Sequence, residues 1–505
     1  MKRLHSPQDA AQWLRTQVRG VLHTDSRRVG AGDGFIAWPG GVTDGRQFVA
    51  SALKQGATAC VVEHAGADAF AWGQNDISDA IATYDGLKAA SGLIAAAYYE
   101  QPSQQLDVVA ITGTNGKTSS AWWLAHALQN AGKRCAIVGT LGVGEVGHLE
   151  VTGMTTPDPV LLQARLRDMV DAGVNACAIE ASSIGLAEHR LDGTQVRVAM
   201  FTNFTQDHLD YHGDMASYWQ AKLALFSWTG LQAAVVNVDD AQGAALAAQL
   251  QTRGDLNVWT ISCAANAVPS AQHIVARHIQ HGARGLCFEV VEGEEAHALD
   301  TQLVGHYNVS NVLGVIACLR ALGYSLADAV QACRVLPAVP GRMQTIGEAG
   351  EPLVVIDYAH TPDAVAQAVQ ALLPLAKSRG GELTCVLGCG GDRDAAKRPL
   401  MAAAAEQYAQ HVVLTSDNPR SEDPQTILNQ MLTGLHNAAK AIVIADRAQA
   451  IAQTVQHAHA HDVVLVAGKG HEDYQEISGV KHPFSDVQHA RDALTQRSKD
   501  GRAHV

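Results

Sequence analysis

Short runs of apolar residues recur along the chain, and most are followed by a polar or glycine-rich turn and then by a stretch with helical spacing. The clearest example is 107–112, Asp-Val-Val-Ala-Ile-Thr, which precedes a glycine-rich turn and an Ala/Leu-rich segment that continues to about Asn130. Strands that are apolar at every position are typical of parallel sheets with both faces covered. The pattern therefore predicts an α/β protein built on mostly parallel sheets.

This alternation of predicted strands and helices appears in two series. We expect strands at 107–112, 135–138, 176–179 and 233–237 in the first, and at 353–357, 383–387, 411–415, 441–444 and 463–467 in the second. The second series predicts a doubly wound domain, in which ligands bind at the carboxyl ends of the strands. Four of its strands lead into polar or glycine-rich loops, which contain Asp357, Gly388, Asp417 and Gly468. Such loops would share one edge of one sheet, so they predict a binding site there.

Two breaks, at 101–105 and 336–341, divide the chain. Its 505 residues are too many for one core at about 100–200 residues per domain. We expect three domains: a small N-terminal α/β domain at 1–102, a central domain with a P-loop ATPase-like, mostly parallel sheet at 103–335, and a Rossmann-like, doubly wound domain at 336–505.

Composition narrows the class of protein. The hydrophobic fraction of 47% and the charged fraction of 17% indicate a globular chain, and a net charge of -13 argues against a nucleic-acid partner. No apolar run is long enough to cross a membrane, and the first residues lack the apolar run of a secretory signal. The nine cysteines include no Cys-x-x-Cys pair, which favours buried thiols in a reducing compartment. We therefore expect a cytoplasmic protein.

The segment Gly113 to Thr118, Gly-Thr-Asn-Gly-Lys-Thr, stands between a predicted strand and a predicted helix. Backbone amides and a helix N-terminus can cradle phosphates at such a place. Lys117 would reach the terminal phosphates, and the Thr118 hydroxyl would ligate magnesium. The loop departs from the common phosphate-loop spacing, because Ile111 stands where the first glycine is expected. A glycine-rich helix start without a ligand is the alternative interpretation.

This compact loop resembles that of the Mur ligase family, which shares it with folylpolyglutamate synthetases. Further matching stretches lie at 155–159, 180–186, 201–203, 207–213, 308–311, 341–343 and 357–363. The resemblance is closest to the members that add the third amino acid, of the meso-diaminopimelate type. It implies an ATP-dependent acid–amino-acid ligase that joins meso-2,6-diaminopimelate to UDP-N-acetylmuramoyl-L-alanyl-D-glutamate through an acyl phosphate. That reaction is a step of peptidoglycan synthesis, and so of cell wall biogenesis, cell shape and cell division.

The resemblance also implies the residues that handle ATP and metal. The ATP-binding residues would be Gly113, Thr114, Asn115, Gly116, Lys117, Thr118, Ser119, Asn308, Arg342 and Asp357. The catalytic residues would be Lys117, Glu180, His208 and Lys222. Thr118 and Glu180 would hold one magnesium ion, while His208 and Lys222 would help to hold a second. For this, Lys222 would have to be carbamylated by carbon dioxide, because an ammonium cannot ligate a cation; from spacing alone Lys222 is an ordinary lysine on an amphipathic helix.

A second set matches the contacts of the UDP-muramoyl peptide. Its members are Thr24, Ser26 and Thr43 in the first domain, where Thr43 lies in the stretch 41–46, and Thr155, Thr156, Ser182, Glu188 and Arg190 in the central domain. Capping and turn formation are the alternative roles for Ser182 and the threonines. Glu188 departs from the family pattern, which has Gln. A negative charge beside an anionic substrate is unfavourable unless a cation such as Arg190 pairs with it.

A third set matches the amino-acid site and comprises Arg393, Asp417, Asn418, Pro419, Arg420, Gly468 and Glu472. Arg420 would grip the carboxylate that diaminopimelate has and lysine lacks, and Glu472 would hold the distal ammonium. The alternatives are a lysine-adding Mur ligase, a folylpolyglutamate synthetase-like ligase, and a nucleotide-binding protein that no longer ligates. We expect a monomer that binds ATP, Mg²⁺ and both cosubstrates, and neither nucleic acid nor membrane.

Overall fold

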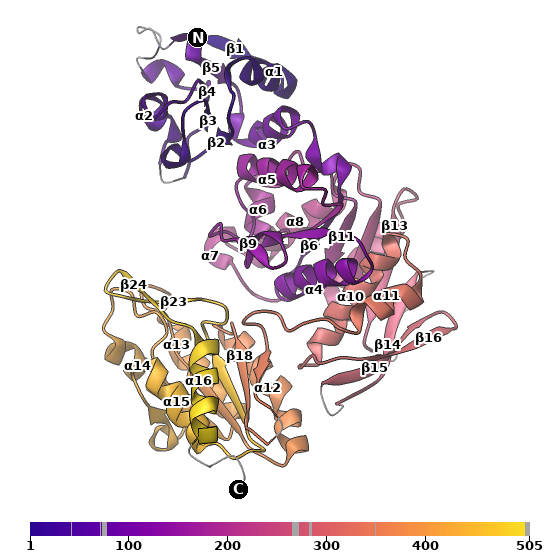
Figure 1. Ribbon diagram of the computed structural model, residues 1–505, viewed down its shortest axis with the longest axis vertical. Coiled ribbons are helices and arrows are strands. Elements are labelled where there is room, and N and C mark those ends of the chain that lie inside the picture. The colour runs from indigo at the N-terminus through magenta and orange to yellow at the C-terminus, as the bar shows by residue number, and fades with distance from the viewer. Residues whose placement is uncertain are drawn as a thin grey trace. The chain divides into compact units, whose positions relative to one another are not determined.

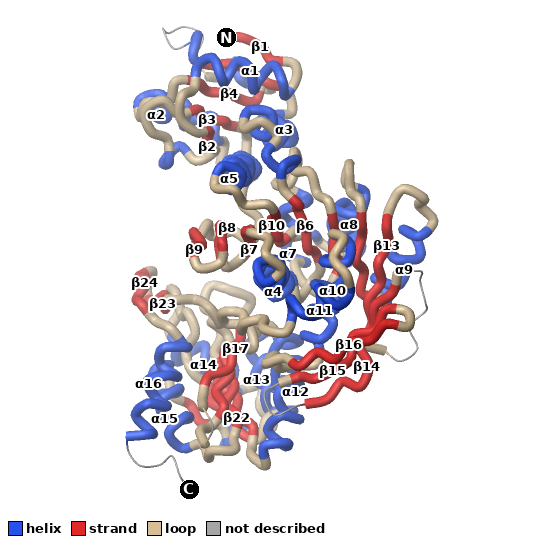
Figure 2. Tube along the Cα trace, turned by 45° about the vertical axis from the view of Figure 1, so that its right-hand side comes forward, coloured by secondary structure: helices blue, strands red, loops and turns tan. Residues whose placement is uncertain are grey.

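The computed structural model describes residues 1–41, 43–70, 72, 78–264, 272–281, 285–348 and 350–499 (Figures 1 and 2). Two compact units are present. Unit 1 comprises Met1–Arg277, Glu289–His297 and Ser310–Arg334, and unit 2 comprises His278–Phe288, Ala298–Val309 and Val335–Val505. Three large sheets with parallel cores confirm the predicted α/β class. The domain limits at 102 and 335 stay a prediction.

The first sheet is wholly parallel and has the order β1-β5-β4-β3-β2. Its strands are β1 (Lys2–Leu4), β2 (Leu22–His23), β3 (Gly34–Ala37), β4 (Ala59–Glu63) and β5 (Ile81–Tyr84). Alternate side chains of the strands lie on opposite faces of the sheet. Ile36 and Val61 pack in one hydrophobic cluster with α1 (Pro7–Gln17) and α3 (Leu87–Tyr98). Phe35 and Cys60 pack in another cluster with α2 (Val49–Lys54). The continuous apolar strands are therefore buried on both sides.

The central sheet has the order β16-β15-β14-β13-β12-β11-β6-β10-β7-β8-β9. Its strands are β6 (Asp107–Thr112), β7 (Cys135–Gly139), β8 (Gly142–Glu145), β9 (His148–Glu150), β10 (Ala176–Glu180), β11 (Val198–Phe201), β12 (Ala233–Asn237), β13 (Asn257–Ser262), β14 (His273–His281), β15 (Leu286–Glu292) and β16 (Glu295–Asp300). All four strands predicted in this region are present. Only β7–β8 and β8–β9 are antiparallel in the part from β13 to β9.

The helices after these strands are α4 (Lys117–Asn130), α5 (Pro159–Asp171), α6 (Ser183–Ala187), α7 (Leu209–His212), α8 (Met215–Leu223), α9 (Ala241–Gln251), α10 (Tyr307–Ala321) and α11 (Leu326–Cys333). Side-chain caps fix several of their starts; Asp158 accepts from the Val160 amide at α5, for example. Helix α4 differs, because its N-cap is Gly116 in a left-handed conformation with no side-chain cap. The first-turn amides of α4 are thus left to bind another acceptor.

The third sheet lies in unit 2 and has the order β17-β18-β22-β19-β20-β21. Its strands are β17 (Gln344–Ile346), antiparallel at the edge, β18 (Leu353–Asp357), β19 (Leu383–Leu387), β20 (His411–Leu414), β21 (Ile442–Val443) and β22 (Val463–Ala467). One face packs on α12 (Pro362–Arg379), α13 (Lys397–Tyr408) and α14 (Pro424–Leu432), and the other on α15 (Arg447–His457) and α16 (Asp486–Lys499). Helices on both faces confirm the doubly wound arrangement.

Strand register sets the position of the unit 2 loops. Asp357 and Leu387 both pair with Ala467, so the loops after β18, β19 and β22 leave one edge of the sheet together, as the sequence predicted. A hairpin of β23 (Tyr474–Ile477) and β24 (Val480–Pro483) follows the last of these loops. The strand predicted at 441–444 is shorter than expected, because it forms an exposed edge with few pairing residues.

None of the nine cysteines, all of which lie in the described ranges, forms a disulfide, and seven of them are buried. No helix among the residues the structure describes is both long and apolar enough to cross a bilayer.

Candidate active site

The phosphate-loop segment has the backbone of an anion-binding turn. Gly113 and Gly116 have φ angles of 145° and 86°, which residues with a Cβ rarely adopt. A Cβ at Gly113 would lie 1.9 Å from Thr202 Oγ1, and one at Gly116 would lie 2.4 Å from Asn311 Oδ1. Both glycines are therefore needed for the loop to close against its neighbours and to direct its amides outward from α4.

Two lysines converge on the same carbonyl of this loop. Lys117 Nζ and Lys222 Nζ each donate to the Gly113 oxygen at 2.8 Å. Lys222 is only 1% exposed and lies over the Tyr218 ring, with Nζ 4.4 Å from its centroid. Burial, reinforced by the charge of Lys117, holds the pKa of Lys222 well below its usual range, against the opposing effect of Asp207. The enclosure of Lys222 therefore favours its neutral amine form over the ammonium.

Thr118 and Glu180 form a pair of oxygen ligands beside the phosphate loop. The Thr118 hydroxyl donates to Glu180 Oε2 at 2.9 Å, and the Thr140 amide donates to Glu180 Oε1 at 2.8 Å. Glu180 is 1% exposed, and a Cβ on Gly139 would lie 2.2 Å from its Oε1. Hard oxygen ligands beside a phosphate-binding helix start suit Mg²⁺, which usually takes one or two protein carboxylates and completes its shell with water and phosphate oxygens.

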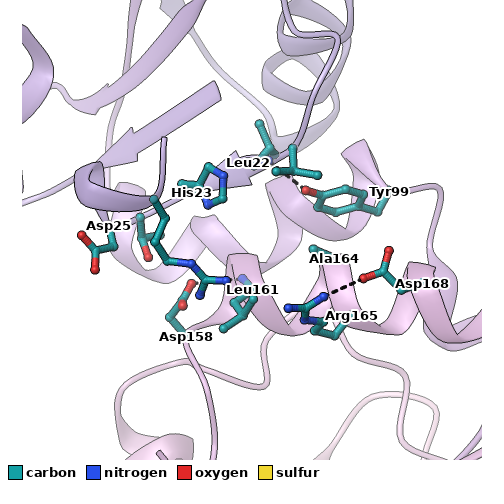
Figure 3. A pocket seen from close by; sticks show the side chains of 12 residues that line it. Leu22, His23, Asp25, Tyr99, Asp158, Leu161, Ala164, Arg165 and Asp168 are labelled. Atoms are coloured by element: carbon teal, nitrogen blue, oxygen red, sulfur yellow. Dashed lines mark hydrogen bonds and ion pairs between the residues drawn. The ribbon is translucent and has the colours of Figure 1, made fainter. Parts of the chain in front are cut away.

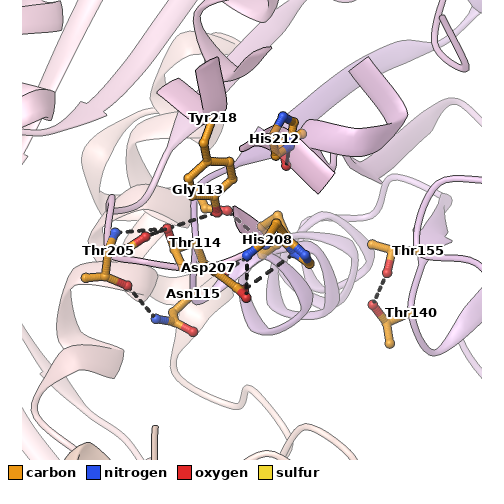
Figure 4. A network of polar contacts seen from close by, with 12 residues as sticks. Gly113, Thr114, Asn115, Thr140, Thr155, Thr205, Asp207, His208, His212 and Tyr218 are labelled. Carbon is orange, nitrogen blue, oxygen red and sulfur yellow. Dashed lines mark hydrogen bonds and ion pairs between the residues drawn. The ribbon is translucent and has the colours of Figure 1, made fainter. Parts of the chain in front are cut away.

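His208 lies next to this loop with Asp207 and Tyr218 (Figure 4). Its Nε2 is 3.4 Å from Asp207 Oδ2, and its ring centroid is 6.0 Å from that of Tyr218. The Tyr218 hydroxyl in turn lies 3.1 Å from Thr114 Oγ1. Burial lowers the pKa of His208, although Asp207 partly offsets that effect. His208 and Lys222 thus both lie against Tyr218, and a neutral imidazole is a competent metal ligand.

The residues matched to the muramoyl peptide form a hydrogen-bonded row beside Glu180. Thr155 Oγ1 lies 3.0 Å from Thr140 Oγ1 (Figure 4), and Thr156 Oγ1 lies 2.9 Å from Ser182 Oγ. Arg190 Nη1 donates to the Thr156 carbonyl at 3.0 Å. Ser182 also caps α6, since its Oγ accepts from the Gly185 amide at 3.0 Å. Capping is therefore a real role of Ser182, and it places the hydroxyl within this row.

Glu188 has a cation partner that sequence reasoning did not find. Lys88 Nζ, from α3, lies 2.6 Å from Glu188 Oε2, and the Tyr211 hydroxyl donates to Glu188 Oε1. Lys88 is the main cause that lowers the pKa of Glu188, followed by Tyr211, while Arg190 acts only through its charge. The condition that a cation pairs with Glu188 is thus met by Lys88 and not by Arg190, the example that the sequence suggested. Local sequence gives no signal for it, because the two residues lie 100 positions apart.

Two of the three residues matched to the nucleotide, Thr24 and Ser26, lie at or next to the lining of a cavity of about 150 Å³ (Figure 3). Thr24 lines this cavity, and Ser26 begins the short turn that follows Asp25. The lining residues are Val21, Leu22, His23, Thr24, Asp25, Arg28, Tyr99, Asp158, Leu161, Ala164, Arg165 and Asp168. Thr43 is exposed, and its carbonyl accepts from the Gly40 amide at 2.9 Å; the adjacent Val42, within the predicted stretch, lies outside the described residues.

In unit 2, Arg342 and Asp357 lie close together. The Asp357 carboxylate accepts from the Met343 and Ala359 amides at 2.8 and 2.9 Å. Burial raises the pKa of Asp357, and Arg342 opposes that effect. The Arg342 guanidinium lies over the Tyr358 ring at 4.4 Å. Asn308, 4% exposed, donates to the Val304 carbonyl at 2.7 Å.

Two loops of unit 2 that carry residues matched to the amino-acid site meet at Asn418, which is 2% exposed. Its Nδ2 donates to Glu472 Oε2 at 2.8 Å, and Lys469 Nζ donates to Asn418 Oδ1 at 3.0 Å and to Glu472 Oε2 at 3.2 Å. Asp417 lies beside Gly468, where a Cβ would stand 2.3 Å from its Oδ2. Lys469 belongs to the glycine-rich loop noted in the sequence but was not predicted as a site residue.

Arg420 follows Pro419 with a φ of 52°. Its Nη1 donates to the Gly391 carbonyl at 2.6 Å, and its Nε lies 3.7 Å from Glu476 Oε2. This arrangement joins the loop after β19 to the loop after β20. Arg393 is exposed, and within the described ranges its side chain makes no hydrogen bond or ion pair, so the structure does not bring it into the network.

Comparison with protein families gives matches along most of the chain. The Mur ligase family catalytic domain matches residues 20–98, the Mur ligase middle domain matches 111–319, and the Mur ligase glutamate ligase domain matches 341–470.

Three similar proteins share one name. A protein of Acidovorax sp. (strain JS42), 57% identical over 97% of both chains, and one of Janthinobacterium sp. (strain Marseille), 48% identical over 97% of both, are each named UDP-N-acetylmuramoyl-L-alanyl-D-glutamate--2,6-diaminopimelate ligase. A solved structure of a ligase with that name is 34% identical, covers 95% of both chains and has a TM-score of 0.67.

Proposed function

The chain belongs to the Mur ligase family, and we propose that it uses ATP to join meso-2,6-diaminopimelate to UDP-N-acetylmuramoyl-L-alanyl-D-glutamate, a step of peptidoglycan precursor synthesis. The observation that carries this proposal is the pairing of two sites in one chain. One is a phosphate loop with the Thr118–Glu180 pair, and the other is the Asn418–Arg420 loop against Glu472. The names of the relatives, of which one is 57% identical over 97% of the chain, favour diaminopimelate over lysine and over folylpolyglutamate synthesis.

The chemistry requires that a carboxylate oxygen become a leaving group. Transfer of the γ-phosphoryl group of ATP to the D-glutamyl carboxylate gives an acyl phosphate and releases ADP. The neutral amine of diaminopimelate then attacks the acyl carbon, and the amide forms with release of phosphate and a proton. Phosphoryl transfer depends mainly on positioning and charge neutralisation. Lys117 and the amides of 113–118, at the start of α4, would supply both for the phosphates, together with Ser119, Asn308, Arg342 and Asp357 for the rest of ATP.

Thr118 and Glu180 would hold a magnesium ion against the phosphate oxygens. The fit rests on two oxygen ligands that already lie 2.9 Å apart, with Glu180 held from the other side by the Thr140 amide. Magnesium bound there would neutralise the charge that develops on the transferred phosphoryl group.

We further propose that Lys222 is carbamylated and that it holds a second magnesium ion with His208. Carbamate formation begins with a neutral amine, and the buried Lys222, with its lowered pKa, provides one. The change turns a buried amine into an anion, which suits the position beside the Lys117 ammonium. Lys222 Nζ now donates to the Gly113 carbonyl, so the carbamate would stand at the phosphate loop itself.

The residues proposed to bind the substrates fall into three sets. Thr24, Ser26 and Thr43 would bind the uridine diphosphate end, and Thr155, Thr156, Ser182, Glu188 and Arg190 the muramoyl dipeptide. Arg393, Asp417, Asn418, Pro419, Arg420, Gly468 and Glu472 would bind the amino acid. Domains at 1–102, 103–335 and 336–505 would correspond to these roles. The absence of disulfides among the nine cysteines supports a reducing, cytoplasmic location, and a monomer is proposed because one chain supplies every residue of these sets.

Phosphate release tests the proposal. Purified protein with ATP, Mg²⁺ and the UDP-muramoyl dipeptide should release phosphate with meso-diaminopimelate, far less with L-lysine, and little when either cosubstrate is omitted. ATP hydrolysis that ignores both cosubstrates would exclude ligation. Equal rates with lysine would favour the lysine-adding alternative, and turnover with a folate and glutamate would favour the folylpolyglutamate synthetase-like alternative. Light scattering measures the oligomeric state.

A further inference from the structure

The proposed chemistry assigns no role to Lys469, yet its position is unusual for a lysine. Its side chain has 0% exposure, and its ammonium contacts Asn418 Oδ1 at 3.0 Å and Glu472 Oε2 at 3.2 Å. A lysine is rarely buried completely, because the ammonium must recover by pairing and hydrogen bonding what it loses in hydration. Both of its polar partners belong to the proposed amino-acid site.

These contacts fix which way the Asn418 amide points. Its Oδ1 accepts from Lys469 Nζ and from the Glu476 amide, the latter at 2.9 Å. Both neighbours are donors only, so the amide must present its oxygen to them and its Nδ2 to Glu472, at 2.8 Å. Glu472 Oε2 therefore receives two donors and is turned inward.

The other oxygen of Glu472, Oε1, takes no part in these contacts. The side chain keeps 21% exposure, and among the residues that the structure describes no hydrogen bond or ion pair to Oε1 is seen. Arg447, another buried cation whose charge reaches Glu472, cannot replace Lys469, because its guanidinium is committed to both oxygens of Asp486 at 2.7 Å. In the part of the chain that the structure describes, Lys469 is thus the cation in direct contact with this carboxylate.

We propose that Lys469 is a positioning residue for the amino-acid substrate: by holding Oε2 of Glu472 inward, it presents Oε1 to the distal ammonium of diaminopimelate. This inference rests on the proposed function and deepens it. Without Lys469, the Asn418 amide loses one of the two donors that orient it, and Glu472 loses the ammonium that holds its Oε2 in place.

The test compares Lys469→Met with wild type on two amino acids, meso-diaminopimelate and 2-aminopimelate, which lacks the distal amino group. For diaminopimelate, KM should rise about 10- to 100-fold while kcat changes by less than about threefold. For 2-aminopimelate, which makes no contact with Glu472, kcat/KM should stay within about twofold, as should KM for ATP. Lys481→Met is the matched control: its ammonium also lies over the Tyr474 ring, at 4.1 Å against 5.5 Å for Lys469, but it is exposed and should leave every constant unchanged.

An equal loss for both amino acids would make Lys469 a purely structural residue and overturn the inference. A wild-type enzyme that does not distinguish the two amino acids would also overturn it, because Glu472 would then not bind the distal ammonium. Failure of wild type to turn over any diaminopimelate would instead overturn the proposed function. Should Lys469→Met not fold, Lys469→Gln and a crystal structure of wild type with diaminopimelate decide the matter: Oε1 on the distal ammonium with Oε2 on Lys469 supports the inference, and any other pairing refutes it.

Discussion

The ammonium of Lys88 lies 2.6 Å from Glu188 Oε2 and so ties α3 to the end of α6, beside the residues proposed to bind the muramoyl dipeptide. Glu188 would otherwise present an unpaired negative charge to an anionic substrate. Lys88→Met should therefore raise KM for the UDP-muramoyl dipeptide roughly three- to tenfold, a modest effect because both side chains are partly exposed. Steady-state kinetics with the dipeptide varied measures it.

Removing both charges provides the control for that pair. Lys88→Met with Glu188→Gln should return KM close to the wild-type value, because the neutral amide needs no counter-ion. Lys54→Met, an exposed lysine of α2, should have no effect. If the double variant is worse than Lys88→Met alone, the pair acts as a structural tie and not as charge compensation.

The Thr118–Glu180 contact predicts a magnesium-dependent defect. Glu180→Gln keeps the shape but removes the charge that would hold the ion, so kcat should fall at least about 100-fold, or roughly 3 kcal/mol in transition-state stabilisation. The magnesium concentration for half-maximal activity should rise as well, which a titration of rate against Mg²⁺ measures. Glu145→Gln, which breaks only a surface pair with Arg134, should behave as wild type. An unchanged Mg²⁺ requirement would remove Glu180 from the metal site.

Lys222 gives a prediction that depends on pH and carbon dioxide. The fraction of Lys222 in the neutral amine form rises as the pH rises through its lowered pKa. With bicarbonate present, the amount of carbamate and the activity should therefore increase with pH. Both should fall in CO₂-free buffer at acidic pH. Lys222→Ala should be nearly inactive and should regain part of the rate with short carboxylic acids; Lys440→Ala, an exposed lysine, is the control. Full activity of Lys222→Ala, or a density map with a free ammonium remote from metal, contradicts the hypothesis.

Arg420 should determine the choice of amino acid. Arg420→Ala removes the guanidinium that lies between Gly391 and Glu476. For diaminopimelate, kcat/KM should fall by the factor that corresponds to a loss of about 2–5 kcal/mol in transition-state binding. L-lysine has no second carboxylate to pair, so its kcat/KM should fall far less, and KM for ATP should stay the same. Arg491→Ala, on the exposed side of α16, serves as control. Equal losses for the two amino acids would make Arg420 a scaffold residue.

The sequence by itself determined the class of fold and the places where chemistry could occur. Continuous apolar strands such as 107–112 and 463–467 must be buried on both faces of a sheet, and this requirement can be read from the residues of each strand alone. The glycines at 113 and 116 likewise predict a turn with backbone angles that other residues rarely adopt. The polar residues that follow the strands lie at one edge of the sheet, because parallel strands run in the same direction. These features follow from short-range geometry, so the sequence was sufficient to find them.

Tertiary structure alone decided which distant side chains meet. Lys222 reaches the carbonyl of Gly113 across 109 positions, and Lys88 rather than Arg190 pairs with Glu188. Burial is equally non-local: neither Lys222 nor Lys469 differs in its sequence context from an exposed lysine, yet each is enclosed by segments that fold onto it from elsewhere. A charge is perturbed by whatever surrounds it in space, and the spacing of residues along the chain does not contain that information.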